Sequence, residues 1–428
     1  MAPSISPTDI SKHIDEIGNR IEAANVDKAS CTNVVRRILY SDAELARLEV
    51  QAMTSLSPEA EKVLNDRLDS FTKQLNLRPF SKGNPLGKFF RFTSLVFSLM
   101  ISGAFLALPM ILLRSVDSVL HTNTSEYLKR MIAHWLLLVS GVMVTIEGLQ
   151  GDDLFREACV LLTFSHASNL DGFMLSCSCP VRHYALAKKE LFLVPFFSWI
   201  SLAFGGVPVD RNDRTRAIRA LQRSTEAATS SEGGSGMCLV IAPEGTRSKT
   251  GQLSAFKKGA FHMWEQLQAP IVPFITYGAF DLYPVGSWIN NTGRVTGRYL
   301  TPIQPHEASS REEMSNLLRK RMLEALRDCP EESSTLSTAE LLCHYAAINI
   351  TWAISLLLSR YIARLLTVTM GLTARAAVAL VVLISVFITV VLYVYYVYIV
   401  SMGGGKTDSE KTKKKQHNVS SSEKAKGE

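Results

Sequence analysis

An uncharged run near the C-terminus, residues 376–402, limits what this 428-residue chain can fold into. About 20 consecutive apolar residues cross the hydrocarbon layer of a bilayer, whereas runs of about 10–14 are typical of buried helices in soluble proteins. The run ends in a cluster of tyrosines of the kind found at membrane interfaces, namely Tyr393, Tyr395, Tyr396 and Tyr398. We expect one transmembrane helix here and another at 341–359, an apolar stretch that Arg360 and Arg364 follow.

Two further apolar runs lie earlier in the chain. Residues 92–113 carry no charge and are long enough for one crossing, with Lys88 and Arg91 before them and Arg114 after them. Gly103 and Pro109 would kink such a helix, so a re-entrant segment is an open alternative. The second run, 131–146, is too short for a crossing and favours an interfacial or core helix. We therefore assign 86–150 to membrane-associated helices.

The remaining segments have patterns of soluble structure. In residues 1–85, isoleucines recur at helical spacing and predict a small helical bundle: Ile10, Ile14, Ile17 and Ile21. From residue 151 to 330, buried strands are expected at 159–164, 206–209, 237–242 and 271–275, and helices at 215–228, 257–267 and 311–327. This alternation predicts an α/β fold whose mostly parallel central sheet is covered by helices. The tail 403–428 has the composition of a disordered segment.

Composition excludes several function classes. The chain has 46 Lys and Arg against 39 Asp and Glu, a net charge of +7. It lacks a basic stripe interleaved with aromatic residues, which argues against nucleic-acid binding. The tail carries seven Lys and four acids beside a predicted span, which favours an anionic lipid surface. Seven irregularly spaced cysteines predict free thiols in a reducing compartment, and the Cys177–Cys179 pair has no second pair with which to hold a metal. No secretory signal peptide is expected at the N-terminus.

Candidate catalytic and binding residues follow the predicted strands. His166 and Asp171 lie five residues apart at a strand-to-helix turn, so the carboxylate can accept from one ring nitrogen and leave the other as a base. Asp210 and Arg211 end the strand at 206–209, although a structural salt bridge is an equal alternative for Arg211. Pro273 falls inside a predicted buried strand, where proline usually marks an edge or a bulge.

A second polar block, Ala242 to Ser248, ends the strand at 237–242. Gly245 permits a close backbone turn, Thr246 supplies a hydroxyl, and the planar fork of Arg247 matches a phosphate. Lys257 and Lys258, with Gly259, are weaker candidates for contact with a phosphate, and a solvated helix start is the alternative for them.

These residues form four blocks along the chain. In chain order, the blocks resemble those of the glycerolipid acyltransferase superfamily, typified by 1-acyl-sn-glycerol-3-phosphate acyltransferases. His166 and Asp171 match its H-x4-D motif, and the blocks Asp210–Arg211, Glu244–Arg247 and Pro273 match the other three. The resemblance implies the family fold and acyl transfer from acyl-CoA to a lysophospholipid hydroxyl. It also implies substrate-binding roles for Asp210, Arg211, Glu244, Gly245, Thr246, Arg247 and Pro273. The chain has no G-x-S-x-G elbow and no P-loop, which argues against a serine lipase or an ATP-driven enzyme.

From this resemblance we expect a membrane-bound enzyme that converts lysophosphatidic acid to phosphatidic acid, with acyl-CoA as co-substrate and no resident cofactor or metal. Glycerol-3-phosphate and lysophosphatidylcholine are alternative acceptors, and a catalytically inactive membrane scaffold is the alternative from another class. The last five residues resemble a dilysine retrieval signal of the endoplasmic reticulum, so we expect that membrane, a cytosol-facing site and unglycosylated sequons at Asn290 and Asn418. The oligomeric state is open.

Overall fold

The computed structural model describes residues 6–24, 32–53, 56–79, 85–101, 107–120, 124–148, 159–181, 183–193, 197–209, 238–287, 290–330, 336–370, 373 and 375–376. Three N-terminal helices come first: α1 (Pro7–Ala23), α2 (Asn33–Ala52) and α3 (Pro58–Gln74). Their N-caps are Ser6, Thr32 and Ser57, and each side-chain oxygen accepts a hydrogen bond from a backbone amide of the first turn. The isoleucine stripe of α1 is buried against α2 and α3, as the spacing predicted.

The central sheet has seven strands in the order β1-β7-β6-β2-β5-β3-β4. Five of them run parallel: β6 (Ile271–Tyr277), β2 (Val160–Phe164), β5 (Cys238–Ile241), β3 (His183–Lys188) and β4 (Gly206–Val209). The strand β7 (Gly293–Tyr299) is antiparallel to β6, and β1 (Val142–Glu147) is parallel to β7. The sheet is therefore mostly parallel, with two reversed strands at one side.

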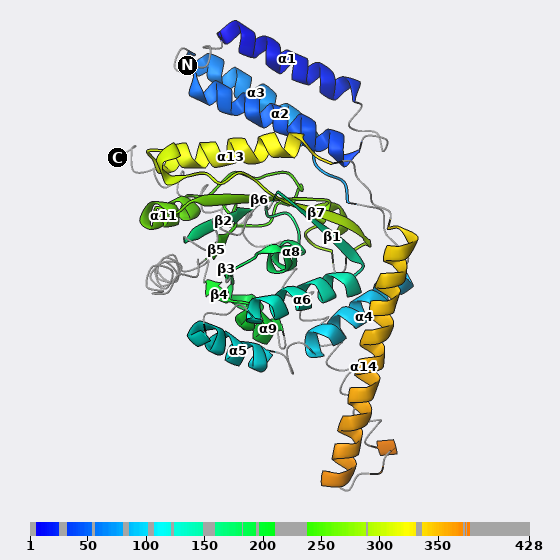
Figure 1. Cartoon of the computed structure of the whole chain (residues 1–428). Coiled ribbons are helices and arrows are strands. Elements are labelled where there is room, and N and C mark those ends of the chain that lie inside the picture. The colour runs from blue at the N-terminus through cyan, green and yellow to red at the C-terminus, as the bar shows by residue number, and fades with distance from the viewer. Residues whose placement is uncertain are drawn as a thin grey trace, which may run out of the picture.

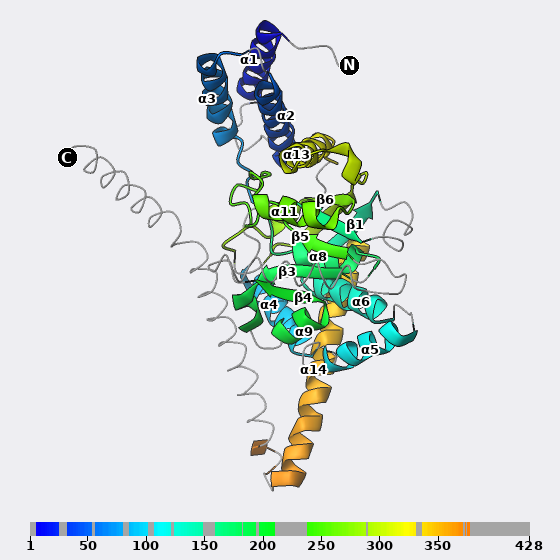
Figure 2. The same cartoon turned by 90° about the vertical axis from the view of Figure 1, so that its left-hand side faces the viewer.

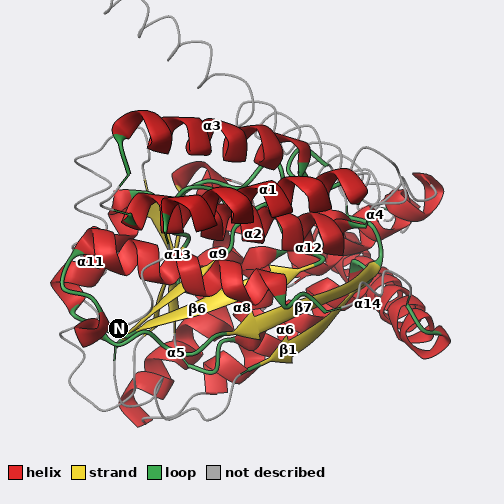
Figure 3. Cartoon of the chain, turned by 90° about the horizontal axis from the view of Figure 1, so that it is seen from above, coloured by secondary structure: helices red, strands yellow, loops and turns green. Residues whose placement is uncertain are grey.

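Helices cover both faces of this sheet (Figures 1 and 3). On one face, α11 (Lys258–Leu267) and α13 (Arg311–Arg327) bury apolar side chains against β2 and β6. On the other face lie α6 (Thr124–Val139) and α8 (Asp171–Ser178), together with α9 (Phe197–Ala203). The short elements are α12 (Ala279–Leu282) and the 3₁₀ turns η2 (Lys189–Leu193) and η3 (Pro305–Glu307).

The N-terminal helices stack on the outer side of α13 (Figures 1 and 2). Apolar residues of α2, including Leu45 and Leu48, pack against the core beneath α13. Ion pairs join the same two helices: Arg319 contacts Glu44 at 2.5 Å and Arg327 contacts Asp42 at 2.7 Å. The N-terminal region is thus attached to the α/β domain by both apolar and charged contacts.

The apolar runs fold in different ways. Residues 131–146 form the second half of α6 and then β1, with a turn between them at Gly141, whose φ is 78°. The predicted core helix is therefore present, but the run also contains a strand. Residues 92–113 fall on two helices, α4 (Pro85–Ile101) and α5 (Ala107–Leu120), and 102–106 lie outside the described residues.

In the described part of the chain, one helix is long and apolar enough to cross a membrane, and it lies within α14 (Thr338–Met370). The first half of α14 packs on α4 and α6, where Trp352 donates to Ser94 at 3.1 Å and stacks edge-to-face on Phe97. The second half extends beyond the α/β domain (Figures 1 and 2), with large exposed apolar side chains: Leu356, Leu357, Tyr361, Leu365 and Val368. The crossing predicted at 376–402 and the tail 403–428 lie outside the described residues.

All four predicted strands are present, whereas the helix predicted at 215–228 lies outside the described residues. The expectation that Pro273 marks an edge or a bulge is wrong, because β6 lies inside the sheet between β2 and β7. The Pro273 carbonyl accepts from Leu300 at 2.8 Å, one residue beyond the end of β7. The missing proline N–H thus falls where the β6–β7 pairing stops, and costs the sheet one terminal hydrogen bond.

Candidate active site

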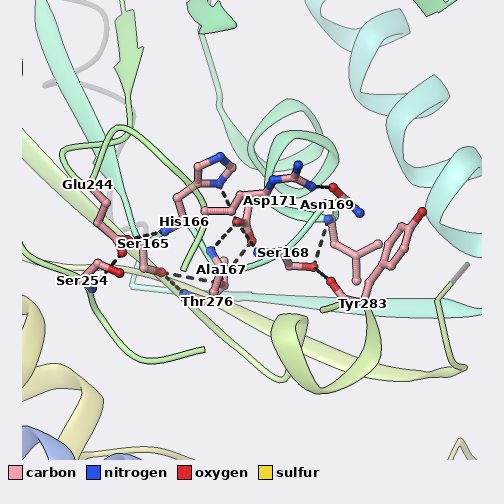
Figure 4. Close-up of polar contacts among 12 residues, drawn as sticks. Ser165, His166, Ala167, Ser168, Asn169, Asp171, Glu244, Ser254, Thr276 and Tyr283 are labelled. Atoms are coloured by element: carbon pink, nitrogen blue, oxygen red, sulfur yellow. Dashed lines mark hydrogen bonds and ion pairs between the residues drawn. The ribbon is translucent and has the colours of Figure 1, made fainter. Parts of the chain in front are cut away.

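Three neighbouring parallel strands, β5, β2 and β6, deliver polar side chains to the same edge of the sheet. His166 follows β2, the block from Ala242 follows β5, and Thr276 lies near the end of β6. The carboxyl edge of a parallel sheet is where α/β proteins bind their ligands. Figure 4 shows these side chains converging around His166 and Asp171.

The two residues of the H-x4-D motif form a hydrogen-bonded pair. His166 Nδ1 lies 2.9 Å from Asp171 Oδ2. An ionised carboxylate can only accept, so Nδ1 carries the proton and Nε2 holds the lone pair. The His166 side chain is 20% exposed, whereas Asp171 is fully buried. The imidazole is therefore oriented by a buried acceptor and is itself accessible to a ligand.

Asp171 is held by its own loop as well as by the imidazole. It is the first residue of α8, and its Oδ2 also accepts from the backbone amides of Ala167 (3.0 Å) and Ser168 (2.9 Å). The other oxygen, Oδ1, is 3.5 Å from the hydroxyl of Thr276. The five-residue spacing thus closes a tight turn in which a single carboxylate oxygen organises three donors.

Glu244 connects this turn to the loop after β5. Its two oxygens accept from backbone amides on opposite sides, from His166 at 2.7 Å and from Ser254 at 2.8 Å. The residue is 2% exposed, and this burial raises its pKa to about 7, while the two amide hydrogen bonds act to lower it. In this structure the Glu244 carboxylate therefore holds two backbone segments together.

The rest of the E-G-T-R block lies beside the pair. Gly245 has a φ of 67°, and a Cβ at this position would come within 2.8 Å of the Lys257 side chain, so the turn requires glycine. Thr246 is exposed. The guanidinium of Arg247 is half-buried and donates through Nη1 to the side-chain oxygen of Asn169. Asn169 therefore anchors Arg247 to the turn that carries His166 and Asp171.

Asn169 is a site residue that the sequence reasoning missed. It lies between His166 and Asp171, where its polar side chain was a signal, but its partner Arg247 is 78 residues away. Ser254 and Thr276 were missed for the same reason, since their roles depend on tertiary contacts.

The structure describes some of the other predicted site residues. Asp210 and Arg211 are outside the described residues. Pro273 is buried in β6 and shapes the sheet. The amide of Lys257 donates to Pro243 at 2.8 Å, which closes the loop around Gly245. Cys177 and Cys179 are buried free thiols.

Comparison with known proteins agrees with this geometry. Residues 148–277 match the family model named Acyltransferase. A 1-acyl-sn-glycerol-3-phosphate acyltransferase from Saccharomyces cerevisiae is 31% identical over 203 residues, which cover 46% of this chain and 65% of that protein. A 1-acyl-sn-glycerol-3-phosphate acyltransferase from Cocos nucifera is 31% identical over 169 residues, which cover 40% of this chain and 52% of that protein. Residues 148–277 are thus similar to the acyltransferase domain of these enzymes.

Two further similarities extend over more than half of the chain. A putative 1-acyl-sn-glycerol-3-phosphate acyltransferase of Caenorhabditis elegans, acl-2, is 27% identical over 248 residues, covering 57% of this chain and 84% of that protein. The crystal structure of the acyltransferase PlsC from Thermotoga maritima aligns with 58% of this chain and 99% of that one, at 21% identity and a TM-score of 0.48. The chain spans about half to two thirds of the length of the first two relatives.

Proposed function

We propose that this protein transfers a fatty acyl group from acyl-CoA to the free hydroxyl of lysophosphatidic acid, giving phosphatidic acid and CoA. The observation that carries the proposal is the His166–Asp171 pair, whose partly exposed imidazole shares a turn with Asn169, the residue that anchors the guanidinium of Arg247. The likeness to proteins named 1-acyl-sn-glycerol-3-phosphate acyltransferases supports the choice of acceptor.

In the proposed reaction, Nε2 of His166 takes the proton of the acceptor hydroxyl as its oxygen attacks the thioester carbonyl. The resulting imidazolium is stabilised by Asp171, and the tetrahedral intermediate collapses with loss of the CoA thiolate, which receives the proton. General base catalysis of this kind contributes about 10²–10⁴-fold. Thiolate is a good leaving group, so no covalent acyl-enzyme is needed.

Arg247 is the proposed ligand of the acceptor phosphate. A guanidinium binds a phosphate through two parallel hydrogen bonds, which a lysine cannot reproduce. The contact with Asn169 occupies Nη1 and fixes the plane of the fork. Gly245 and Thr246 form the turn that carries it, and Asp210 and Arg211 remain proposed binding residues.

A panel of substrates tests the proposal. Protein purified in detergent is given labelled acyl-CoA with lysophosphatidic acid, glycerol-3-phosphate or lysophosphatidylcholine, and the products are separated. We expect the highest kcat/KM with lysophosphatidic acid. A preference for another acceptor would overturn the assignment of substrate, and no product with any acceptor in wild type would favour the inactive scaffold.

We further propose that the protein resides in the endoplasmic reticulum membrane with its site toward the cytosol. The exposed apolar side chains on α14 support membrane association, as do Phe89 and Phe90 on α4. The sequon at Asn290 does not report topology, because this side chain is buried and donates to the Ser140 carbonyl at 2.7 Å. A C-terminal tag on intact microsomes should be digested by added protease, and protection of the tag would contradict this orientation.

A further inference from the structure

One face of the N-terminal helix α2 is turned toward the back of the candidate active site. Its polar residues Asn33, Arg37 and Tyr40 are four and three positions apart, which places them on the same side of the helix. The matched family segment, 148–277, does not include this helix. Two separate lines of contact lead from this face to the His166–Asp171 pair.

The first line runs through α12. Arg37 forms an ion pair with Asp281 at 2.6 Å, and both side chains are buried, at 4% and 0% exposure. Asn33 donates to the other oxygen of Asp281, also at 2.6 Å. Directly after α12, the carbonyl of Tyr283 accepts from the Ser168 hydroxyl at 2.9 Å. The amide of Ser168 is one of the donors that hold the orienting carboxylate of the site.

The second line runs through the loop after the E-G-T-R block. The Tyr40 hydroxyl donates to the Leu253 carbonyl at 2.9 Å. The Gln252 side chain is buried and donates to two backbone carbonyls of the N-terminal region. Ser254 follows Leu253 and donates its amide to Glu244, which also accepts from the amide of His166.

The space between these two lines is nearly filled. It contains a cavity of about 20 Å³, which is room for a single water molecule. Its lining includes Arg37, Ser165, Ala167, Glu244 and Thr276. This small volume points to a supporting contact between α2 and the site.

We propose that α2 is a positioning element for the reaction: through α12 and the 250–254 loop, it fixes the two backbone segments that carry His166 and Asp171. This inference rests on the proposed function, since it assigns the N-terminal helices a task in that same site. A displacement of about 1 Å in a catalytic constellation can cost about 10²-fold in rate. Loosening one face of α2 therefore lowers kcat and leaves substrate affinity unchanged.

The test uses the full chain with Tyr40→Phe, Asn33→Ala and the two combined. Tyr40→Phe keeps the ring and removes only the hydroxyl. The matched control is Arg67→Gln, which removes the exposed ion pair with Asp15 that joins α3 to α1 and faces away from the site. We expect the combined variant to lose about tenfold in kcat, with the KM of both substrates within twofold of wild type. The control keeps wild-type kinetics.

Hydrogen–deuterium exchange supplies a readout that does not depend on turnover. Peptides covering 164–171 and 244–254 should exchange several-fold faster in the combined variant, and not in the control. If the combined variant fails to accumulate, Tyr40→Phe alone tests the role of α2. We then expect a loss of about two- to threefold in kcat and faster exchange of the peptide 244–254.

The outcomes separate the two proposals. If the wild type acylates no acceptor, the proposed function and the catalytic role of α2 are both overturned, and faster exchange in the variant would then show only that α2 holds the two segments in place. An active wild type whose variants change neither kcat nor exchange at these peptides would overturn the role of α2 and leave the function standing. Equal losses in the control and the combined variant would also overturn it, because they indicate general destabilisation.

Discussion

Replacing Asp171 with asparagine should slow the reaction by only about 5- to 30-fold, because two backbone amides dictate how the asparagine side chain can be placed. In the wild type, Oδ2 accepts from the amides of Ala167 and Ser168 as well as from His166 Nδ1. Only the carbonyl oxygen of asparagine can face two N–H groups. Its NH₂ group then points to the Thr276 hydroxyl, which can accept from it. The imidazole therefore keeps its tautomer.

What the variant loses is the charge of the acceptor. A hydrogen bond to a charged group contributes about 1.5–3 kcal/mol, against about 0.5–1.5 kcal/mol for a neutral one, so the imidazolium loses about 1–2 kcal/mol of stabilisation. Each 1.36 kcal/mol is tenfold in rate, which gives the stated loss of about 5- to 30-fold. A substitution that stabilised the wrong tautomer would instead cost about 10⁴-fold, as it does in serine proteases.

The assay compares kcat and melting temperature of wild type, Asp171→Asn and Asp171→Ala in one detergent, with both substrates saturating. The alanine variant leaves two amides without an acceptor at about 1–3 kcal/mol each, so its stability and its rate should fall together. A loss near 10⁴-fold in the asparagine variant with an unchanged melting temperature would refute the argument that the amides fix the tautomer. A loss below twofold would show that the charge of Asp171 is not used.

Three further predictions address the other site residues. His166→Ala should lower kcat at least about 10²-fold at an unchanged melting temperature, and retention of more than a tenth of the rate would contradict a general base. Arg247→Lys should raise the KM for the acceptor much more than that for acyl-CoA, and equal increases would point to a structural role. Burial raises the pKa of Glu244 to about 7, so the folded state keeps a proton that the unfolded chain has lost, and stability should fall as pH rises from about 4.5 to about 7. In equilibrium unfolding, the free energy of unfolding of wild type should fall by about 3 kcal/mol across this pH window relative to that of Glu244→Gln. Parallel curves of unfolding free energy against pH would contradict the burial argument.

The sequence predicts β2, β5 and β6, which are mostly buried, and also β4, which is only half-buried, but it misses β1, β3 and β7. The strand β2 is a continuous apolar run, and its burial on both faces makes that run necessary. The strand β7 alternates buried and partly exposed positions and contains two glycines and two arginines, so no apolar run reveals it. The strand β1 was hidden because its residues continue the apolar run of α6, and only the turn at Gly141 separates them.

Contacts that are local in the chain were predictable at the site, and contacts across the fold were not. The His166–Asp171 hydrogen bond spans five residues and follows from the strand-to-helix turn. The family resemblance implied a substrate-binding role for Glu244, and this role stays a prediction. Its burial and its two amide partners depend on how loops 78 and 10 residues away pack around it, which a motif does not encode.

The buried ion pair between Arg37 and Asp281 also bears on how the protein is made. Its partners are 244 residues apart in the chain. A ribosome that adds about 5–20 residues per second needs roughly 12–50 s to cover that distance. Helices α1–α3 have an apolar core of their own and can form early in synthesis. Arg37 nevertheless waits for its counter-charge until α12 has emerged, so the docking of the first-made helices is among the later events of folding.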